Sequence, residues 1–334
     1  MPSLARVRAP RTVDRRPGFH ARQKLLWLAP VTDANPIHGV YGAPPPALAE
    51  PPPGARQHSP FVPGSFAIET ASDDAFAGFV MLAPPGAAER RFVLAHALRA
   101  LAPGASLIAL APKAQGGARL RAELEAFGCT VAERSKAHHR ICETVRPFEL
   151  DGIEAAIEAG APRLDPTLGL WTQPGVFAFD RIDAGTALLI EHLPPFSGQG
   201  ADLGSGLGVL SRAVLASPSI AALHLVEIDR RAVEAARRNL PDARAVHHWA
   251  DARTVGLGGL DFVVSNPPFH VEGVESRALG QDFVRSSAAM LRRGGRLRLV
   301  ANRHLPYEAV LRERFARVET VAEGSGYKIF EAVK

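Results

Sequence analysis

The sequence has only two cysteines among its 334 residues, Cys129 and Cys142, far too few for a disulfide scaffold. We therefore expect a reducing compartment. No uninterrupted run of about 18 apolar residues occurs, so the sequence predicts no transmembrane helix. The N-terminal segment is basic and lacks the apolar core of a secretion signal. These absences together predict a cytoplasmic protein without a membrane partner.

The composition favours a globular protein with an acidic partner. A hydrophobic content of 46% allows a substantial core, and the formal net charge is +5 with a pI near 9.6. A positive protein attracts polyanions, so nucleic acid is the first candidate and a membrane surface the second. Residues 1–22 are rich in arginine and predict a basic flexible arm, which is either simply disordered or contacts RNA. No metal site is predicted.

Apolar, β-branched runs alternate with helical runs rich in Ala, Leu and Arg, which predicts an α/β fold with a mainly parallel sheet. A proline-rich stretch at 43–60 predicts an extended surface loop. A second stretch rich in Pro and Gly, at 158–175, marks a boundary. We predict a first domain at 23–157, a linker at 158–173 and a second domain at 174–334.

The two halves contain the same ordered series of segments. "FVMLAPPG" (79–86) corresponds to "FVVSNPPF" (262–269), and "LAPGASLIALAPK" (101–113) corresponds to "LRRGGRLRLVANR" (291–303). In each half an amphipathic helix and a short basic strand follow. This order and spacing indicate two copies of one fold, although generic α/β units could resemble each other by chance.

The copies differ where chemistry is expected. Ala83 and Gly86 stand where the second copy has Asn266 and Phe269, and no glycine-rich loop precedes Phe79. The first half is therefore predicted to be degenerate, with a role in scaffolding or binding. The second half is the candidate catalytic domain.

A glycine-rich loop in "GADLGSGLGVLSRAVLA" (200–216) follows a predicted strand and precedes a helix from about Val209. Such loops bring backbone N–H groups close to a ligand at a helix N-terminus; a tight turn without a ligand is the alternative. Glu227 ends the next strand, at the offset where an acid contacts a ribose. Asp251 ends a third strand, where it could accept from an adenine amine or cap a helix. The candidate residues of this cofactor loop are Asp202, Gly204, Ser205, Gly206 and Gly208.

The spacing of the glycines separates two classes of cofactor. A dinucleotide site favours G-x-G-x-x-G, whereas this loop has G-x-G-x-G preceded by an acid, Asp202. That pattern suits a ligand with an amino-acid moiety and no pyrophosphate. S-adenosylmethionine is such a ligand.

The strand at 262–264 ends in Asn266, Pro267, Pro268 and Phe269, a stiff turn at the sheet edge where ligands of such folds bind. An exocyclic NH₂ group is a poor nucleophile. Two acceptors on its hydrogens, the Asn266 side-chain oxygen and the Pro267 carbonyl, could direct its lone pair toward a methyl group. Phe269 could stack on a base that has left its helix. An ordinary Pro-Pro turn is the alternative, and His270 is expected to be structural.

These residues give the chain a specific resemblance. The second half resembles class I S-adenosylmethionine-dependent methyltransferases, and most closely the ribosomal RNA small subunit methyltransferase C family, which are guanine-N2 methyltransferases. The matching runs are "PGVF" (174–177), "DAGTALL" (183–189), "NPPFH" (266–270) and "VANRHLPY" (300–307). The resemblance implies two tandem Rossmann-like domains, the first degenerate and the second a seven-stranded sheet with helices on both faces.

The resemblance also implies roles for single residues. Asp202 and the glycines would line the methionine end of the cofactor, Glu227 the ribose and Asp251 the adenine. Asp183, with Thr186, would lie near the cofactor or simply begin a helix. Asn302 and Tyr307 would form a pocket wall or a structural turn. The proline-rich stretch and the basic arm match nothing in the family, and the first domain is expected to be short of its leading strands.

The sequence thus predicts methyl transfer from S-adenosylmethionine to N2 of a guanine in ribosomal RNA, on free RNA or on the assembling small subunit, by a monomer. Three alternatives are weaker. Adenine N6 or a glutamine amide could be the methyl acceptor, because the same turn serves both. An RNA-binding pseudoenzyme would not need the intact loop, Glu227 and Asn266. A dehydrogenase would need a glycine three residues past Gly206, and this loop has none there.

Overall fold

The computed structural model describes residues 36–268, 270–271, 274–275 and 277–334. The predicted basic arm at 1–22 lies outside these residues, as does Phe269. The described residues form one compact unit by their internal contacts. Below, the N-terminal half means residues 36–160 and the C-terminal half residues 161–334.

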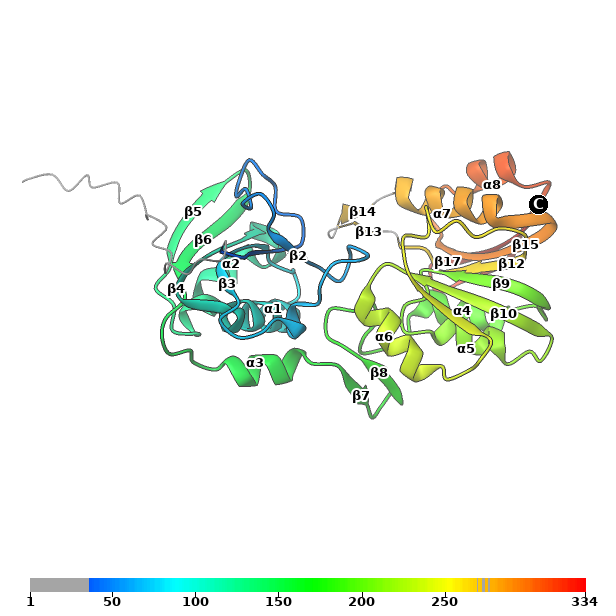
Figure 1. Ribbon diagram of the computed structural model, residues 1–334. Coiled ribbons are helices and arrows are strands. Elements are labelled where there is room, and N and C mark those ends of the chain that lie inside the picture. The colour runs from blue at the N-terminus through cyan, green and yellow to red at the C-terminus, as the bar shows by residue number, and fades with distance from the viewer. Residues whose placement is uncertain (1–35, 269, 272–273, 276) are drawn as a thin grey trace, which may run out of the picture. The chain divides into compact units, whose positions relative to one another are not determined.

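The described part of the N-terminal half contains one six-stranded sheet with the order β2-β1-β3-β4-β6-β5 (Figure 1). Its strands are β1 His38–Tyr41, β2 Arg56–His58, β3 Phe76–Leu82, β4 Leu101–Pro112, β5 Ala132–Lys136 and β6 His139–Val145. Its helical segments are η1 Ile68–Thr70, α1 Ala87–Ala100, η2 Lys113–Gly117, α2 Ala118–Glu125 and α3 Ile153–Gly160. Strands β5 and β6 run antiparallel to their neighbours, whereas β1 to β4 pair in parallel.

The two faces of this sheet are covered differently. Alternate strand residues such as Phe79 and Met81 pack against the helices in one core cluster. The opposite face carries Val80, whose cover includes Leu48 and Ala49 from the proline-rich stretch. That stretch was predicted to be a surface loop, and the prediction is wrong in part. It contains β2, and it buries Leu48 and Ala49 on a face where no helix of the described residues contributes to the core cluster.

The described part of the C-terminal half contains a seven-stranded sheet with the order β11-β10-β9-β12-β15-β17-β16. Its strands are β9 Gly198–Leu203, β10 Ile220–Glu227, β11 Ala245–Trp249, β12 Leu260–Ser265, β15 Leu291–Asn302, β16 Arg317–Gly324 and β17 Tyr327–Val333. The helices are α4 Ala184–Glu191, α5 Val209–Leu215, α6 Arg230–Asn239, α7 Arg277–Met290 and α8 Glu308–Arg314. Two short hairpins are β7 Arg163–Asp165 with β8 Leu170–Thr172, and β13 His270–Val271 with β14 Val274–Glu275.

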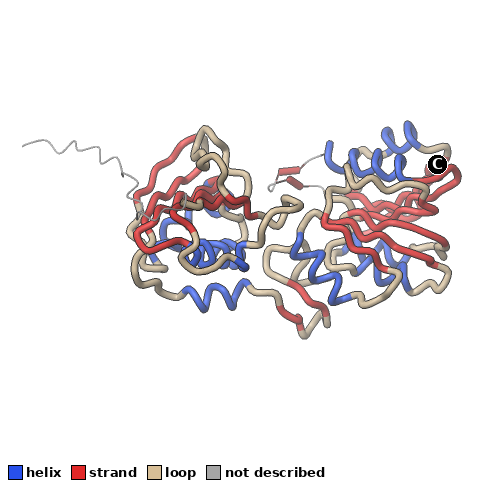
Figure 2. The backbone as a smooth tube through the Cα atoms, in the orientation of Figure 1, coloured by secondary structure: helices blue, strands red, loops and turns tan. Residues whose placement is uncertain are grey.

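Helices cover both faces of the seven-stranded sheet, as Figure 2 shows. Val263 faces a cluster that includes residues of α7 and α8, and its neighbour Val264 faces a cluster that includes residues of α4 and α5. Successive residues of a strand point to opposite faces, so a strand buried on both faces is apolar throughout. The predicted sheet with two covered faces is confirmed.

The strand orders support the predicted duplication. Strands β2-β1-β3-β4-β6-β5 correspond in order and direction to β10-β9-β12-β15-β17-β16. Among the described residues, the first copy has no counterpart of the edge strand β11. It also has no helix between β1 and β2, where the second copy has α5. The proline-rich stretch occupies that connection, which explains why the first copy has no glycine-rich loop.

The predicted linker at 158–173 contains the end of α3 and the hairpin β7–β8. Ile153 and Ala156 of α3 belong to the core of the N-terminal half. The backbone of Trp171 in β8 instead forms two hydrogen bonds with the side chain of Asn239 on α6.

Cys129 and Cys142 are buried and free. Within the described part of the chain, no helix combines the length and the apolar character needed to cross a bilayer.

Candidate active site

The glycine-rich loop joins β9 to α5 at the carboxyl edge of the sheet. Gly204, Gly206 and Gly208 have φ angles of 75°, 51° and 84°, a left-handed conformation that other residues rarely adopt. A Cβ atom on Gly206 would meet open space. The loop is therefore shaped by backbone conformation, with its surface open toward a cleft.

Asp202, just before this loop, is fully buried and lines the cleft. Its Oδ2 accepts a 2.6 Å hydrogen bond from Ser211 Oγ on α5. Its Oδ1 has no hydrogen-bond partner among the described residues. Burial raises the pKa of this carboxyl to about 7. A buried carboxylate oxygen without a partner, at the wall of a cleft, is suited to a cationic ligand group.

Glu227 ends β10 and ties the glycine-rich loop to the neighbouring strand. Its Oε2 accepts from the backbone N–H of Gly206 at 2.9 Å, and its Oε1 accepts from Asp229 N at 2.9 Å. Burial raises the pKa of the Glu227 carboxyl. Each oxygen keeps a second lone pair, so contact with a ribose stays a prediction.

Asp251 follows β11 and closes a turn. Its Oδ1 accepts from the backbone N–H of Arg253 at 2.8 Å, and its carboxylate pairs with the guanidinium of the same residue. This pairing lowers the pKa of Asp251. No helix begins at this point of the described chain, so Asp251 does not cap a helix and instead stabilises a turn. Contact with adenine stays a prediction.

Asn266 follows β12 and lies beside the glycine-rich loop. A Cβ atom on Gly204 would lie 3.8 Å from the Asn266 carbonyl oxygen and 3.9 Å from Pro268 Cδ. The preceding residue, Ser265, donates a 2.7 Å hydrogen bond to the carbonyl of Leu203 and so joins the ends of β12 and β9. The structure thus brings the predicted cofactor loop and the predicted reacting turn together.

Asp183 connects the same turn to α4. It is the N-cap of this helix, and its Oδ2 accepts from Thr186 N at 2.9 Å. That oxygen also accepts from Asn266 Nδ2 at 2.8 Å. The sequence predicts that Asp183 lies near the cofactor or begins a helix. In the structure Asp183 caps the N-terminus of α4 and accepts a hydrogen bond from Asn266.

The cleft is also lined by side chains that the sequence reasoning did not single out, among them Phe177, Arg181, Ile182 and Leu210. Phe177 is 57% exposed, so its ring is open to contact at the wall of the cleft. The next residue, Ala178, has a φ of 52° in the left-handed region. The only signal in the sequence was the motif "PGVF", which ends at Phe177.

Asn302 and Tyr307 were expected to form a pocket wall or a structural turn. Tyr307 is 1% exposed and belongs to the core of the C-terminal half. A Cβ atom on Gly280 of α7 would lie only 1.6 Å from its hydroxyl oxygen, so the ring packs directly against that helix. Asn302 pairs with Tyr327 across β15 and β17. The structure favours the structural alternative for both.

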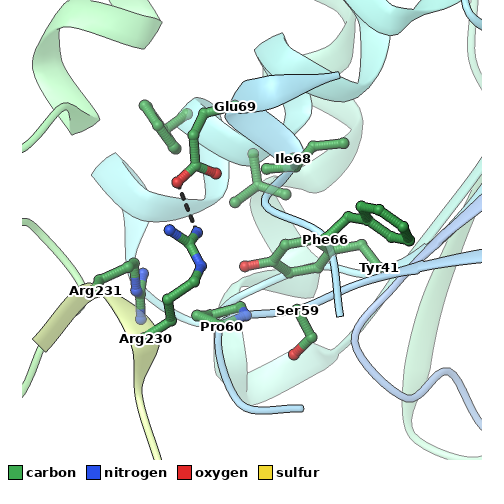
Figure 3. A pocket seen from close by; sticks show the side chains of 10 residues that line it. Tyr41, Ser59, Pro60, Phe66, Ile68, Glu69, Arg230 and Arg231 are labelled. Atoms are coloured by element: carbon green, nitrogen blue, oxygen red, sulfur yellow. Dashed lines mark hydrogen bonds and ion pairs between the residues drawn. The ribbon is translucent and has the colours of Figure 1, made fainter. Parts of the chain in front are cut away.

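A second, smaller cavity involves α6 and the N-terminal half (Figure 3). Arg230 points toward Glu69, and their side chains form a 2.6 Å salt bridge. Arg231 forms another salt bridge, with Glu89. The acids around this cavity are thus neutralised by the chain itself. The cleft at Asp202 and Asn266 is the stronger candidate for a ligand.

Comparison with known proteins agrees with this geometry. The Methyltransferase small domain family model matches residues 167–331. Ribosomal RNA small subunit methyltransferase C of Pseudomonas paraeruginosa is 32% identical over 260 residues, which cover 74% of this chain and 76% of that protein. The chain belongs to the ribosomal RNA small subunit methyltransferase C family. The predicted family is confirmed.

Other members of the methyltransferase C family match over a shorter span. The protein of Shewanella halifaxensis is 37% identical over 162 residues, so the chain spans about half the length of this relative, 48% of each chain. Among solved structures, the T. thermophilus 16S rRNA N2 G1207 methyltransferase in complex with AdoMet and guanosine has a TM-score of 0.68 at 26% identity. The match covers 84% of this chain and 77% of that structure. It therefore spans both halves of the chain.

Proposed function

We propose that this protein transfers a methyl group from S-adenosylmethionine to the exocyclic N2 amine of a guanine in small-subunit ribosomal RNA. The observation that carries the proposal is the position of Asn266. Its amide nitrogen donates hydrogen bonds to the side chains of Asp183 and Thr186. Asn266 also lines the same cleft as Asp202 and the glycine-rich loop. An acceptor oxygen for a substrate amine is thereby held next to a candidate cofactor site.

The residues of the cleft fit S-adenosylmethionine. The unpaired Oδ1 of Asp202 would accept from the cationic amino group of its methionine end. The open backbone at Gly206 leaves room for a ligand to approach, and Glu227 beside it would hold the ribose. When bound, the cofactor supplies an electrophilic methyl carbon. The chain's own residues would orient the acceptor amine and stabilise the positive charge that develops on its nitrogen.

The degenerate half contains a direct analogue of the proposed amine recognition. Nη1 of Arg90 donates to the carbonyl oxygens of Pro84 and Pro85, at 3.1 and 2.7 Å. These prolines correspond to Pro267 and Pro268 in the duplicated fold. A guanidinium nitrogen, like the N2 amine of guanine, is a planar NH₂ group with a delocalised lone pair. A Pro-Pro turn of this fold can therefore bind such a group through its carbonyl oxygens.

The exposed ring of Phe177 supports an RNA base as the substrate. A ring at the wall of the cleft provides a face on which an extruded base can stack, and base methylation requires the nucleotide to leave its helix. The sequence predicts base stacking for Phe269 as well, but that residue lies outside the described residues. The net charge of +5 favours a polyanion as partner. We also propose that the protein acts in the cytoplasm as a monomer.

The other acceptors considered from the sequence receive less support. Members of the family are named for ribosomal RNA, and the similar structure from T. thermophilus carries guanosine rather than adenosine or a glutamine peptide. The unpaired Oδ1 of Asp202 would be a costly feature in a pseudoenzyme, because a buried polar atom without a partner destabilises the fold.

The proposal is tested with purified protein, labelled S-adenosylmethionine and small-subunit ribosomal RNA, free or assembled, from cells that lack the protein. Mass spectrometry of the digested RNA should detect N2-methylguanosine at a defined position. Label in N6-methyladenosine, in protein glutamine or in no product would contradict the proposal. Asn266→Ala should lower turnover by about 100- to 1,000-fold, the usual effect of removing a polar group that stabilises transition-state charge, while the cofactor still binds.

A further inference from the structure

The side-chain amide of Asn266 is held from a distant part of the chain. Its Nδ2 donates to Oδ2 of Asp183 and to Oγ1 of Thr186, both at 2.8 Å, across 83 and 80 residues of sequence. Both N–H groups of the amide are therefore used. Since the carboxamide is planar, these two bonds also determine the direction in which its oxygen points.

The chemistry of the acceptors fixes which end of the amide faces α4. A carboxylate only accepts hydrogen bonds, so the group beside Asp183 must be the nitrogen of Asn266. The oxygen Oδ1 is left for the cleft, which Asp183, Thr186 and Asn266 line together.

We propose that Asp183 and Thr186 are positioning residues that hold the carboxamide of Asn266 with its oxygen directed at the substrate amine. This inference rests on the proposed function and gives Asp183 a role different from the cofactor contact expected from the sequence. Asp183 acts on the reaction through Asn266.

The acceptors are fixed before any substrate arrives. Oδ2 of Asp183 also accepts from the backbone N–H of Thr186 at 2.9 Å, so the carboxylate is tied to the first turn of α4. A Cβ atom on Gly185 would lie 2.9 Å from the ring of Tyr327 and 3.1 Å from Oδ2 of Asp183. With the hydrogen bonds from Thr186 N and Asn266 Nδ2, Oδ2 of Asp183 is held in place. A group that is already oriented loses little entropy when the substrate binds.

Asp183 has a second effect that Thr186 lacks. Its negative charge next to the N–H polarises the amide and makes Oδ1 of Asn266 a stronger acceptor. Loss of Asp183 should therefore slow methyl transfer more than loss of the Thr186 hydroxyl, although each makes a single bond to the same nitrogen.

The test compares four variants by cofactor affinity and by single-turnover rate on the ribosomal RNA. Thr186→Val is nearly isosteric and removes only the acceptor, so turnover should fall about tenfold, as for one lost hydrogen bond. Thr186→Ser restores the acceptor and should recover most of the rate. Asp183→Ala should lower the rate further than Thr186→Val. Asp183→Asn keeps an oxygen that can accept from both Thr186 N and Asn266 Nδ2. Its single-turnover rate should lie between those of Asp183→Ala and the parent.

Two further measurements distinguish a positioning role from a merely structural one. If Thr186 positions Asn266, calorimetry should show nearly unchanged affinity for S-adenosylmethionine in Thr186→Val, and the loss should appear in the rate of methyl transfer. In an Asn266→Ala background, Thr186→Val should cost nothing more, since the group it orients is gone. Equal losses of Thr186→Val with and without Asn266 would overturn the inference, as would a parent-like rate in both Thr186→Val and Asp183→Ala.

A spectroscopic measurement separates this inference from the proposed function. The side-chain NH₂ resonances of Asn266, assigned by their absence in Asn266→Ala, should show slow hydrogen exchange in the parent and faster exchange in Thr186→Val. Fast exchange in the parent would refute the hydrogen-bonded amide whatever the reaction is. A protected amide in a protein that methylates no guanine would instead refute the proposed function.

Discussion

Arg231, at the start of α6, forms a salt bridge of 2.6 Å with Glu89 of α1, and both side chains are buried. Arg231 also pairs with Asp229, two residues after Glu227. The backbone N–H of the neighbouring Arg230 donates to the carbonyl of Pro60. The segment that follows Glu227, the predicted ribose ligand, is thus attached to the N-terminal half by buried, charged contacts. The degenerate half therefore supports the proposed cofactor site of the C-terminal half.

Arg231→Met should destabilise the protein by about 3–5 kcal/mol, because two buried acids, Glu89 and Asp229, would lose their shared cation. Glu89→Gln should cost less, since Arg231 keeps Asp229. Arg237→Met, on the exposed side of the same helix, is the matched control and should stay within about 0.5 kcal/mol. Urea denaturation measures all three. Equal stability of Arg231→Met and Arg237→Met would show that the buried pair contributes nothing.

Asp202 should make the stability and the cofactor affinity respond to pH in opposite directions. Its folded pKa of about 7 lies above the ordinary value of 3.8, so the folded state binds more protons and loses stability as pH rises from about 4 to 7. Asp202→Asn removes this loss. Without cofactor it should melt at a higher temperature than the parent at pH 8, with little difference near pH 4.

The same substitution should weaken S-adenosylmethionine binding, measured by calorimetry. The affinity of the parent should rise through pH 7 as the carboxylate becomes charged and can pair with the cationic amino group. A variant that is less stable than the parent at pH 8 and binds the cofactor as tightly would contradict the role of Asp202.

Phe177→Ala should weaken RNA binding without unfolding the protein. Stacking of a base on an aromatic ring contributes about 1–3 kcal/mol, so the KM for RNA should rise by roughly 5- to 150-fold. The ring is 57% exposed, so the melting temperature should change little. Phe148→Ala, at an 86% exposed ring that does not line the cleft, is the control and should leave KM unchanged. Equal KM values for the two variants would exclude a stacking role.

Gly185→Ala should lower stability although alanine is the better helix former. A Cβ atom there would lie 2.9 Å from the ring of Tyr327, and overpacking of this kind costs about 1–3 kcal/mol against a gain in helix propensity of about 1 kcal/mol or less. Turnover should also fall, because Asp183 would shift with the helix. Gly258→Ala, where a Cβ atom would meet nothing within 4 Å, is the control for both measurements.

Much of the second half could be predicted from local patterns. The strand at 262–264, the strand end at Leu203 and the helix from Val209 all appear in the structure where expected. Apolar β-branched runs and glycines in a turn act on their own neighbours, so the sequence alone indicates their conformation. The duplication was visible for the same reason, because corresponding segments carry the same local signals in the same order.

The proline-rich stretch shows where local patterns fail. Its composition predicts an extended surface loop, and yet Leu48 and Ala49 are buried on the sheet. The cause lies elsewhere in the chain, because within residues 36–160 no helix contributes to the core cluster on that face of the sheet. The role of Arg90, whose guanidinium binds the Pro84 and Pro85 carbonyls and Glu123, was equally invisible.

The sequence by itself determined the α/β repeat, the glycine-rich loop after Asp202 and the stiff turn after Asn266, since each depends on the backbone preferences of a few adjacent residues. Only the tertiary structure decided that Asn266 donates a hydrogen bond to Asp183, that Ser211 donates one to Asp202 and that Arg231 forms a salt bridge with Glu89. These contacts join residues on different elements. Their energies depend on distance and burial, which no short stretch of sequence encodes.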